Sequence, residues 1–292
     1  MINLSKQKSK TTNISPYIYI GYQCNNNCVF CSEADEYLEH LKVKDFKEIK
    51  KEILQVRKKY DFVSFMGREP TLRNDLFDIL KFAVSLNFKQ VGVTTNGRLL
   101  SYSGFAKELL NTGINQIGIS LSGATAKVHD KLTQVPGSFE QTVKGISNIS
   151  RFKKPEMSLL VNLPLNRLNY FELKKMIDLL LALKVREINI LFVAPLSRRS
   201  RTKKIIMKTS KLGKYVFDTI KPYLDNPDLK ILLVEFLPCS LPKDAQNYFF
   251  PCLEKNSNKI RIPICQQCSY QDKCDGVLRD YINLYGAGEF KL

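Results

Sequence analysis

Short apolar runs alternate with segments of helical period along the first two-thirds of the chain. Six of these runs have the length and β-branched or aromatic content of buried strands, at residues 17–22, 61–66, 91–95, 116–121, 157–163 and 187–193. Apolar residues recur with helical spacing over residues 45–59, 74–86, 102–112, 139–150, 169–183 and 209–224. Strands that alternate with helices predict a parallel sheet with right-handed crossovers.

The number of these units predicts an open barrel. Six units are fewer than the eight of a closed barrel, so we expect an α/β fold, a partial (βα)6 TIM-like barrel. Beyond about residue 236 the periodicity fails and the chain becomes rich in Pro and Cys, which is typical of a small domain held by metal. We therefore expect a polar N-terminal segment over residues 1–15, a barrel over 16–235 and a small Cys-rich metal-cluster domain over 236–292.

Composition excludes several classes of protein. With 292 residues, 44 % apolar and 25 % charged, the chain is neither wholly disordered nor fibrous. No apolar stretch approaches the roughly 18 residues that cross a bilayer, and the lysine-rich N-terminus lacks the apolar part of a secretory signal. We therefore expect a cytoplasmic protein without membrane insertion. In reducing cytosol, closely spaced cysteines indicate metal or redox chemistry rather than disulfides.

Cys24, Cys28 and Cys31 form a CxxxCxxC pattern directly after the first predicted strand. Thiolates are the soft ligands that iron–sulfur clusters and zinc select. Three protein ligands leave one metal position open, which distinguishes a catalytic metal site from a closed structural one. A zinc site is the alternative, although no fourth ligand is close in sequence, because His40 lies nine residues beyond Cys31 in a helix-like segment.

This pattern, after the first strand of a partial α/β barrel, resembles the radical S-adenosylmethionine superfamily. The resemblance covers roughly residues 16–195. It implies that the three cysteines hold a 4Fe-4S cluster and that S-adenosylmethionine chelates the remaining iron. It also implies reductive cleavage of S-adenosylmethionine to a 5′-deoxyadenosyl radical that takes a hydrogen atom from a substrate. An electron donor such as flavodoxin or ferredoxin is implied as a partner.

The residues after the second strand, Gly67-Arg68-Glu69-Pro70-Thr71, resemble the GGEP motif that contacts the methionine end of the cofactor in this superfamily. Gly67 permits close backbone approach, Pro70 stiffens the turn, and Glu69 offers an acceptor for the cofactor's ammonium group. Arg68 replaces the second glycine, so we expect a negative φ at this position. We also expect its guanidinium to lie near the cofactor carboxylate or the substrate.

The resemblance implies further cofactor contacts at the carboxyl ends of other strands. Asn96, in a TNG turn, orders its loop; Ser120, Ser122 and Asn162 reach the ribose or carboxylate. Phe30 packs near the adenine, and Phe192 lies in the strand edge that receives it. With the GGEP-like residues, the expected cofactor-binding set is Phe30, Gly67, Arg68, Glu69, Pro70, Asn96, Ser120, Ser122, Asn162 and Phe192. The sequence names no catalytic residue.

Five cysteines remain near the C-terminus: Cys239, Cys252, Cys265, Cys268 and Cys274. Their CxxC pair followed by five residues and another Cys resembles the SPASM and twitch domains, which carry auxiliary iron–sulfur clusters. Five cysteines suffice for one fully ligated auxiliary 4Fe-4S cluster with one to spare, so Cys239 and Cys252 compete for the fourth place. A structural zinc ribbon is the alternative, because CxxC pairs also serve zinc.

Charge bears on the substrate. The chain carries 45 Lys and Arg against 28 Asp and Glu, a net charge of +17, which suits an acidic peptide or a phosphate-bearing ligand. We expect a peptide or peptide-derived small molecule as substrate. A tRNA or nucleotide is the alternative, with SRRSRTKK at residues 197–204 as its contact. The opposing class is a non-catalytic, basic, metal-binding nucleic-acid module.

Overall fold

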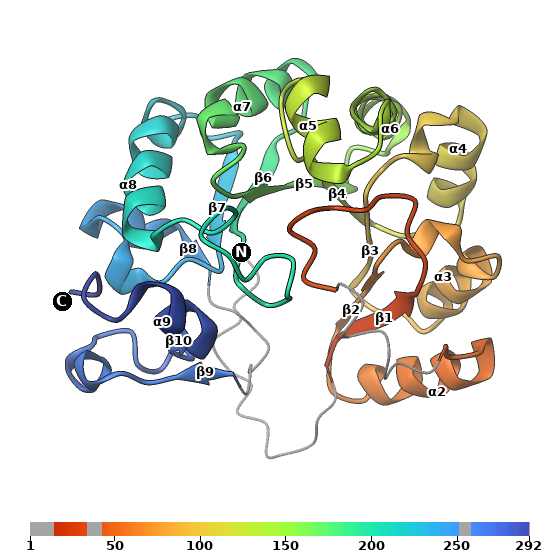
Figure 1. The fold of residues 1–292 in the computed structure, drawn as a ribbon. Coiled ribbons are helices and arrows are strands. Elements are labelled where there is room, and N and C mark those ends of the chain that lie inside the picture. Colours follow the sequence, from red (N-terminus) through yellow and green to blue (C-terminus); the bar gives the residue numbers. More distant parts are fainter. Residues whose placement is uncertain (1–14, 34–42, 251–257, 292) are drawn as a thin grey trace.

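A computed structural model of the chain describes residues 15–33, 43–250 and 258–291. Eight parallel strands form one curved sheet in chain order (Figure 1). The six predicted strands are present as β1 (Tyr17–Gly21), β2 (Phe62–Gly67), β3 (Gln90–Thr95), β4 (Gln116–Ser120), β5 (Ser158–Leu165) and β6 (Glu187–Phe192). Within the described residues no pairing joins the last strand to β1, so the barrel is open, as predicted.

The sheet continues beyond the six predicted strands. β7 (Lys230–Val234) pairs with β6, and the two-residue β8 (Phe249–Phe250) pairs with β7. β8 is too short for any periodicity to show in the sequence. It also lies past residue 235, so part of the Cys-rich C-terminal region completes the sheet of the barrel.

Helices cover the convex side of this sheet (Figure 1). The predicted ones are α2 (Phe46–Arg57), α3 (Leu76–Ser85), α4 (Ser103–Asn111), α6 (Ser138–Phe152), α7 (Leu173–Ala182) and α8 (Thr209–Ile220). Their apolar faces pack on the sheet to form one core, in which Ile53, Leu80 and Ile146 are fully buried. A further helix, α5 (Ala126–Thr133), was not predicted because its eight residues give little more than two turns of pattern.

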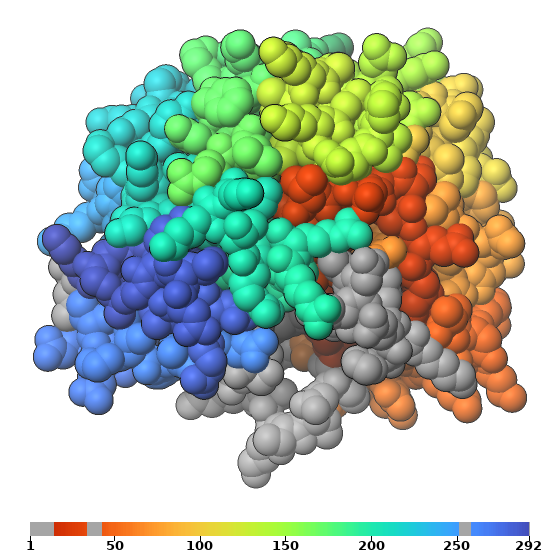
Figure 2. All heavy atoms as spheres, viewed as in Figure 1, coloured from red at the N-terminus to blue at the C-terminus, as the bar shows by residue number. Residues whose placement is uncertain are grey.

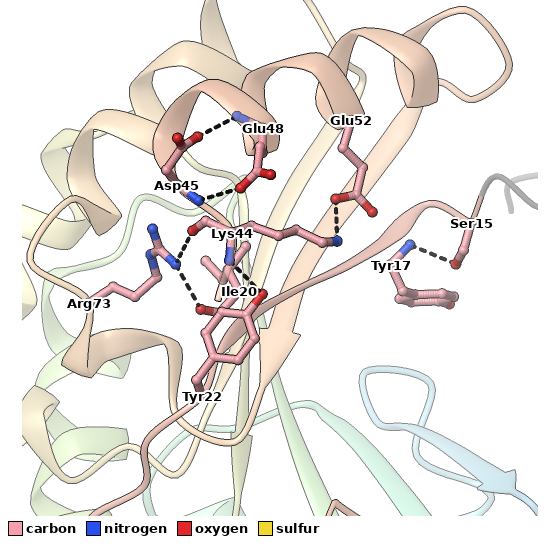
Figure 3. A network of polar contacts seen from close by, with 9 residues as sticks. All are labelled: Ser15, Tyr17, Ile20, Tyr22, Lys44, Asp45, Glu48, Glu52 and Arg73. Carbon is pink, nitrogen blue, oxygen red and sulfur yellow. Dashed lines mark hydrogen bonds and ion pairs between the residues drawn. The ribbon is translucent and has the colours of Figure 1, made fainter. Parts of the chain in front are cut away.

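A polar network fixes the chain at the start of α2, close to the end of β1 (Figure 3). Asp45 and Glu48 form a capping box, in which each side chain accepts from the other's backbone N–H. Arg73 Nη1 donates to the carbonyl of Lys44 (3.2 Å), and the Tyr22 hydroxyl accepts from the Lys44 N–H (3.2 Å). Since Tyr22 lies two residues before Cys24, these bonds anchor one end of the cysteine loop.

The C-terminal region packs against the end of the barrel through aromatic side chains. It contains the antiparallel strands β9 (Lys259–Ile260) and β10 (Val277–Leu278), followed by α9 (Arg279–Tyr285). Tyr281 is buried, and its hydroxyl accepts from the N–H of Thr209 at the start of α8 (2.7 Å). No helix in the described part of the chain is long and apolar enough to cross a membrane.

Candidate functional site

The CxxxCxxC loop follows β1 at the carboxyl edge of the sheet. The backbone of α5 holds it in place, since Asn27 N–H donates to the Thr133 carbonyl (2.8 Å) and Val29 N–H to the Leu132 carbonyl (2.9 Å). The helix that the sequence did not predict therefore supports the loop between Cys24 and Cys31.

The three thiols of this loop lie within electrostatic reach of one another. Burial raises the pKa of Cys24, Cys28 and Cys31. For Cys28, burial and then the neighbouring thiols together raise the pKa to about 12. Without a bound cation, these groups therefore hold their protons. A cationic centre that accepts several thiolates offsets both burial and mutual repulsion, so this donor set fits an iron–sulfur cluster. Among the described residues, no three His, Cys, Asp or Glu side chains form a group ready to hold one metal ion.

Two glycines let the motif after β2 touch the end of β1. Gly67 has φ +116°, and a Cβ there would lie 2.6 Å from the Gly21 carbonyl oxygen. A Cβ on Gly21 would in turn lie 2.8 Å from the Glu69 nitrogen. Both contacts are closer than real Cβ atoms allow, so this approach requires glycine on both strands. The backbones of β1 and β2 thus approach closely at Gly67, and contact of Gly67 with a cofactor stays a prediction.

Arg68 reaches from this motif to the cysteine loop. Its φ is not among the positive values of the described residues, so replacement of the family's glycine causes no backbone strain. Its Nε donates to the Glu33 carbonyl (3.2 Å) just beyond Cys31. The guanidinium also lowers the pKa of Cys24 and Cys31, against the larger effect of burial. Contact of Arg68 with the cofactor stays a prediction.

Glu69 is fully buried and ties the GGEP-like motif to the TNG turn. Its Oε1 accepts from the hydroxyls of Thr71 (2.5 Å) and Thr95 (2.6 Å), and its Oε2 accepts from the Asn96 N–H (2.7 Å). Burial raises the pKa of this carboxyl, and these hydrogen bonds oppose the shift. The protein thus supplies several donors to this carboxylate itself, and an additional bond to an ammonium group stays a prediction.

The TNG turn clamps the cysteine loop. Asn96 Oδ1 accepts from the Arg98 N–H within the turn (3.0 Å), and its Nδ2 donates to Asn25 Oδ1 of the cysteine loop (2.6 Å). Contact of Asn96 with a cofactor stays a prediction. Arg98 donates to the Asn25 carbonyl and, at 3.0 Å, to Asn26 Oδ1, while its Nε donates to Gln141 of α6 (2.6 Å). Sequence reasoning missed Arg98, although a cation directly after the TNG turn was a usable signal.

A polar row crosses the sheet from Ser120, at the carboxyl end of β4, to Asn162 and Asn189, in the middle of β5 and β6. The expectation that Asn162 lies at the end of its strand is wrong, because β5 continues to Leu165. Ser120 pairs in register with Asn162, and Asn162 with Asn189, whose Nδ2 donates to Asn162 Oδ1 (3.2 Å). Asn189 Oδ1 is buried and has no hydrogen-bond partner. Asn189 was missed, although it shares its strand face with Leu191 and stands between two isoleucines of β6. Such an unpaired acceptor offers a contact to a bound ligand.

The remaining predicted cofactor residues are mostly engaged with the protein. Ser122 is buried and its N–H donates to His129 Nδ1 (3.2 Å). Phe192 packs against Phe236 (ring centroids 5.8 Å apart) and Tyr281. Phe30 packs partly buried against the core, and Pro70 is buried at the start of the short 3-10 helix η1 (Pro70–Leu72). Whether these residues contact a cofactor stays a prediction.

The SRRSRTKK segment, residues 197–204, lies against the cysteine loop rather than apart from it. Ser197 Oγ donates to the Cys31 carbonyl (2.6 Å), and Arg199 donates to Asn27 Oδ1. The positive charge of Arg199 lowers the pKa of Cys28 and Cys31 against the larger effect of burial. Guanidinium groups from two elements, the β2 motif and this segment, therefore act on the three thiols.

Four of the five C-terminal cysteines line one cavity. Its wall includes Cys239, Cys265, Cys268 and Cys274, with apolar neighbours such as Ile264. Burial and then the three other thiols raise the pKa of Cys239, to about 12. Cys252, the other candidate for the fourth ligand, lies outside the described residues.

Comparisons with known proteins agree with this geometry. A family profile described as the Radical SAM superfamily matches residues 18–180. A probable GTP 3′,8-cyclase of Saccharolobus solfataricus is 32 % identical over 278 residues, which cover 87 % of this chain and 82 % of that protein. The AdoMet-dependent heme synthase of Methanosarcina barkeri is 28 % identical over 178 residues, 60 % of this chain and 49 % of that protein. The chain thus spans only about half the length of some curated relatives it matches.

Solved structures share the fold. SuiB of Streptococcus suis, bound to the precursor peptide SuiA, has a TM-score of 0.60 at 20 % identity, over 74 % of this chain and 48 % of that one. The protein anSMEcpe, with bound AdoMet and the Cp18Cys peptide, has a TM-score of 0.62 at 13 % identity, over 94 % of this chain and 92 % of that one. With the family profile covering more than half of it, this chain belongs to the Radical SAM superfamily of enzymes, and membership implies a 4Fe-4S cluster and S-adenosylmethionine.

Proposed function

We propose that this chain is a radical S-adenosylmethionine enzyme that abstracts a hydrogen atom from a peptide or peptide-derived substrate. The observation that carries the proposal is the joint presence of the cysteine loop and the four-cysteine cavity at the end of the same barrel. The likeness to peptide-bound anSMEcpe extends over both regions, since it covers 94 % of this chain. SuiB, also solved with a peptide, supports the same class of substrate.

When bound, the cluster and S-adenosylmethionine supply a 5′-deoxyadenosyl radical by one-electron reductive cleavage. The chain's own residues hold the cluster and the cofactor and shield them from solvent. Cys24, Cys28 and Cys31 provide the thiolates, and Arg98 keeps their loop in place through Asn25 and Asn26.

Other residues orient the cofactor. The Arg68 guanidinium offers a charge partner to its carboxylate, and the unpaired Asn189 Oδ1 offers an acceptor to its hydroxyl groups. The apolar barrel interior below the polar row limits access of water to the reacting atoms.

We further propose that the C-terminal cavity holds an auxiliary 4Fe-4S cluster, with Cys239 as the fourth ligand beside Cys265, Cys268 and Cys274. Four thiols on one cavity wall match the number of ligands that a 4Fe-4S cluster needs. The rest of the wall combines apolar side chains such as Ile264 with the polar Arg261 and Gln271. The proposed arrangement is a barrel over residues 16–235 and a cluster-bearing region over residues 236–292, which also lends β8 to the sheet.

A nucleotide substrate is the second candidate. It is favoured by one observation, the 32 % identity to a probable GTP 3′,8-cyclase over 82 % of that protein. A tRNA substrate would likewise suit the net charge of +17.

The substrate class can be tested by 5′-deoxyadenosine formation. Anaerobically reconstituted enzyme with S-adenosylmethionine and reductant is incubated with GTP, with tRNA, or with a peptide fraction of cell extract. We expect the peptide fraction to raise 5′-deoxyadenosine above the uncoupled background, and protease treatment of that fraction to abolish the effect. Stimulation by GTP or tRNA alone would overturn the peptide proposal and leave the radical chemistry intact.

A further inference from the structure

An exposed basic strip follows β6 and runs from Leu196 to Lys208. We define it as residues 196–208, which contain no acidic residue and no aromatic residue. Its exposed side chains include Arg198, Arg201, Lys203, Lys204 and Lys208. Leu196, 39 % exposed, adds one apolar side chain to this surface.

The basic strip lies directly on the cysteine loop. Ser197 Oγ donates to the Cys31 carbonyl at 2.6 Å, and Arg199 donates to Asn27 between the first two cysteines. Figures 1 and 2 show the strip, in teal, beside the red cysteine loop on one face of the molecule. A partner that covers this surface therefore comes close to the three thiols.

The far end of the basic strip is fixed to other parts of the chain. Arg201 forms an ion pair with Asp280 of α9 (3.1 Å). Arg167, which follows β5, donates its N–H to the Ile205 carbonyl (2.8 Å) and its Nε to the Lys203 carbonyl (2.8 Å). A backbone held at both ends presents its cations in a set arrangement, so a partner loses little ordering entropy on binding.

We propose that the basic strip is the docking surface for a small acidic electron-transfer protein that reduces the cluster held by the cysteine loop. The step moves one electron: the reduced carrier is oxidised by one electron, the cluster is reduced by one, and no bond forms or breaks. Electron transfer slows steeply with distance, so the surface in direct contact with the cysteine loop is the favourable place for the carrier. Transient redox complexes have small interfaces, and opposite charges speed their encounter.

Nucleic acid fits this surface less well. Proteins that bind single strands stack bases on aromatic side chains, and the basic strip has none. A nearby ring, that of Tyr285, lies beneath the Lys203 ammonium, 5.4 Å from its centroid, and its hydroxyl donates to the Ile206 carbonyl. A ring engaged in this way offers no open stacking face toward the lysine.

The inference depends on membership of the superfamily and not on the peptide substrate, and its test needs no substrate. Reconstituted enzyme is photoreduced and mixed with oxidised acidic flavodoxin, and the rate of flavosemiquinone formation is followed. In this assay the electron passes from the cluster to flavodoxin, the reverse of the proposed direction, across the same interface. For Lys203→Glu/Lys204→Glu we expect the second-order rate constant to fall about tenfold at low ionic strength, and the difference to shrink as salt is added.

A matched control carries the same change of charge elsewhere. Lys107 of α4 and Lys144 of α6 are exposed on the outer helices, and Lys107→Glu/Lys144→Glu should leave the rate constant within about twofold of wild type. Oxidised methyl viologen, a small cationic acceptor, should take electrons from the strip variant no more slowly than from wild type, which shows that the cluster is intact.

Three results would overturn the inference. Unchanged transfer to flavodoxin in the strip variant would remove the docking role. An equal fall of the rate constant in the two double variants would show that the net charge of the protein, and not the basic strip, determines the rate. Tight binding of tRNA to wild type that is lost in Lys203→Glu/Lys204→Glu, with flavodoxin transfer unaltered, would assign the strip to RNA.

Discussion

Gly67 carries a conformational demand that no other residue type meets. Its φ is +116°, and a Cβ at this position would lie 2.6 Å from the Gly21 carbonyl oxygen. Gly67→Ala therefore forces β1 and β2 apart at the edge where the cluster binds. We expect a loss of about 2 kcal/mol or more in the free energy of unfolding and a lower iron content after reconstitution.

Gly104 gives the matched control. It lies in α4, and a Cβ there would meet no atom within 4 Å, so Gly104→Ala should stabilise the protein by up to about 1 kcal/mol. Denaturant unfolding of both apo-proteins measures the difference. Equal stabilities for the two variants would show that the close approach of the strands is not required.

His129 predicts a pH dependence of stability. Its ring is buried, its Nε2 has no partner, and burial lowers its pKa from 6.5 to about 4. Between pH 6.5 and 4 the unfolded chain therefore binds a proton that the folded chain does not, so stability present above pH 6.5 is lost as pH falls. This one residue should account for about 2 kcal/mol of the loss between about pH 7 and about pH 4.5.

The variant His129→Gln removes that titration. As the pH falls, the free energy of unfolding of this variant should decline less steeply than that of wild type, whatever the variant's stability near neutral pH. Denaturant titration of both proteins from about pH 7 to about pH 4.5 measures this difference. Parallel curves for the two proteins would mean that His129 takes up its proton in the folded state.

The cysteine loop depends on contacts from separate elements, and Arg98 joins three of them. It reaches from the turn after β3 to Asn26 in the loop and to Gln141 in α6. Arg98→Gln removes this clamp without touching a thiol, so we expect a partial loss of iron and faster loss of the cluster in air. Arg151→Gln, an exposed change at the end of the same α6, should keep wild-type iron content.

Those elements also show which parts of the fold the sequence could predict. The six strands and the positions of Gly67 and Asn96 follow from local periodicity and motif spacing, and the structure contains them. The helix α5 was missed because two turns carry too little pattern to stand out. It holds the cysteine loop through backbone carbonyls, which every residue type has, so the amino-acid sequence does not reveal this role.

Arg98 and Asn189 were missed for a different reason. Their partners lie 72 and 27 residues away in sequence, at Asn26 and Asn162, so only the assembled sheet brings them together. The choice between Cys239 and Cys252 was equally a tertiary matter. Spacing alone left both open. The cavity wall includes Cys239 with the other three cysteines, Cys252 lies outside the described residues, and the identity of the fourth ligand stays a proposal.

The whole molecule contains two groups of cysteines. If each group holds its own cluster, a substitution in one group should remove iron from that group alone. Cys239→Ala should lower the iron content by about four atoms per chain, since an incomplete ligand set binds a four-iron cluster poorly. Cys252→Ala is the comparison, and it should keep its iron. Metal analysis after anaerobic reconstitution tests this assignment. Loss of iron in Cys252→Ala alone would exchange the two residues, and zinc in place of iron would indicate a zinc ribbon.

The central claim is that Cys24, Cys28 and Cys31 hold the cluster that cleaves S-adenosylmethionine. The most direct measurement is 5′-deoxyadenosine formation by the protein in which all three are changed to Ala, reduced with dithionite in the presence of S-adenosylmethionine. The account predicts no 5′-deoxyadenosine above the rate without enzyme, while the C-terminal cysteines still retain about half of the wild-type iron. Cleavage by this triple variant at the wild-type rate would contradict it.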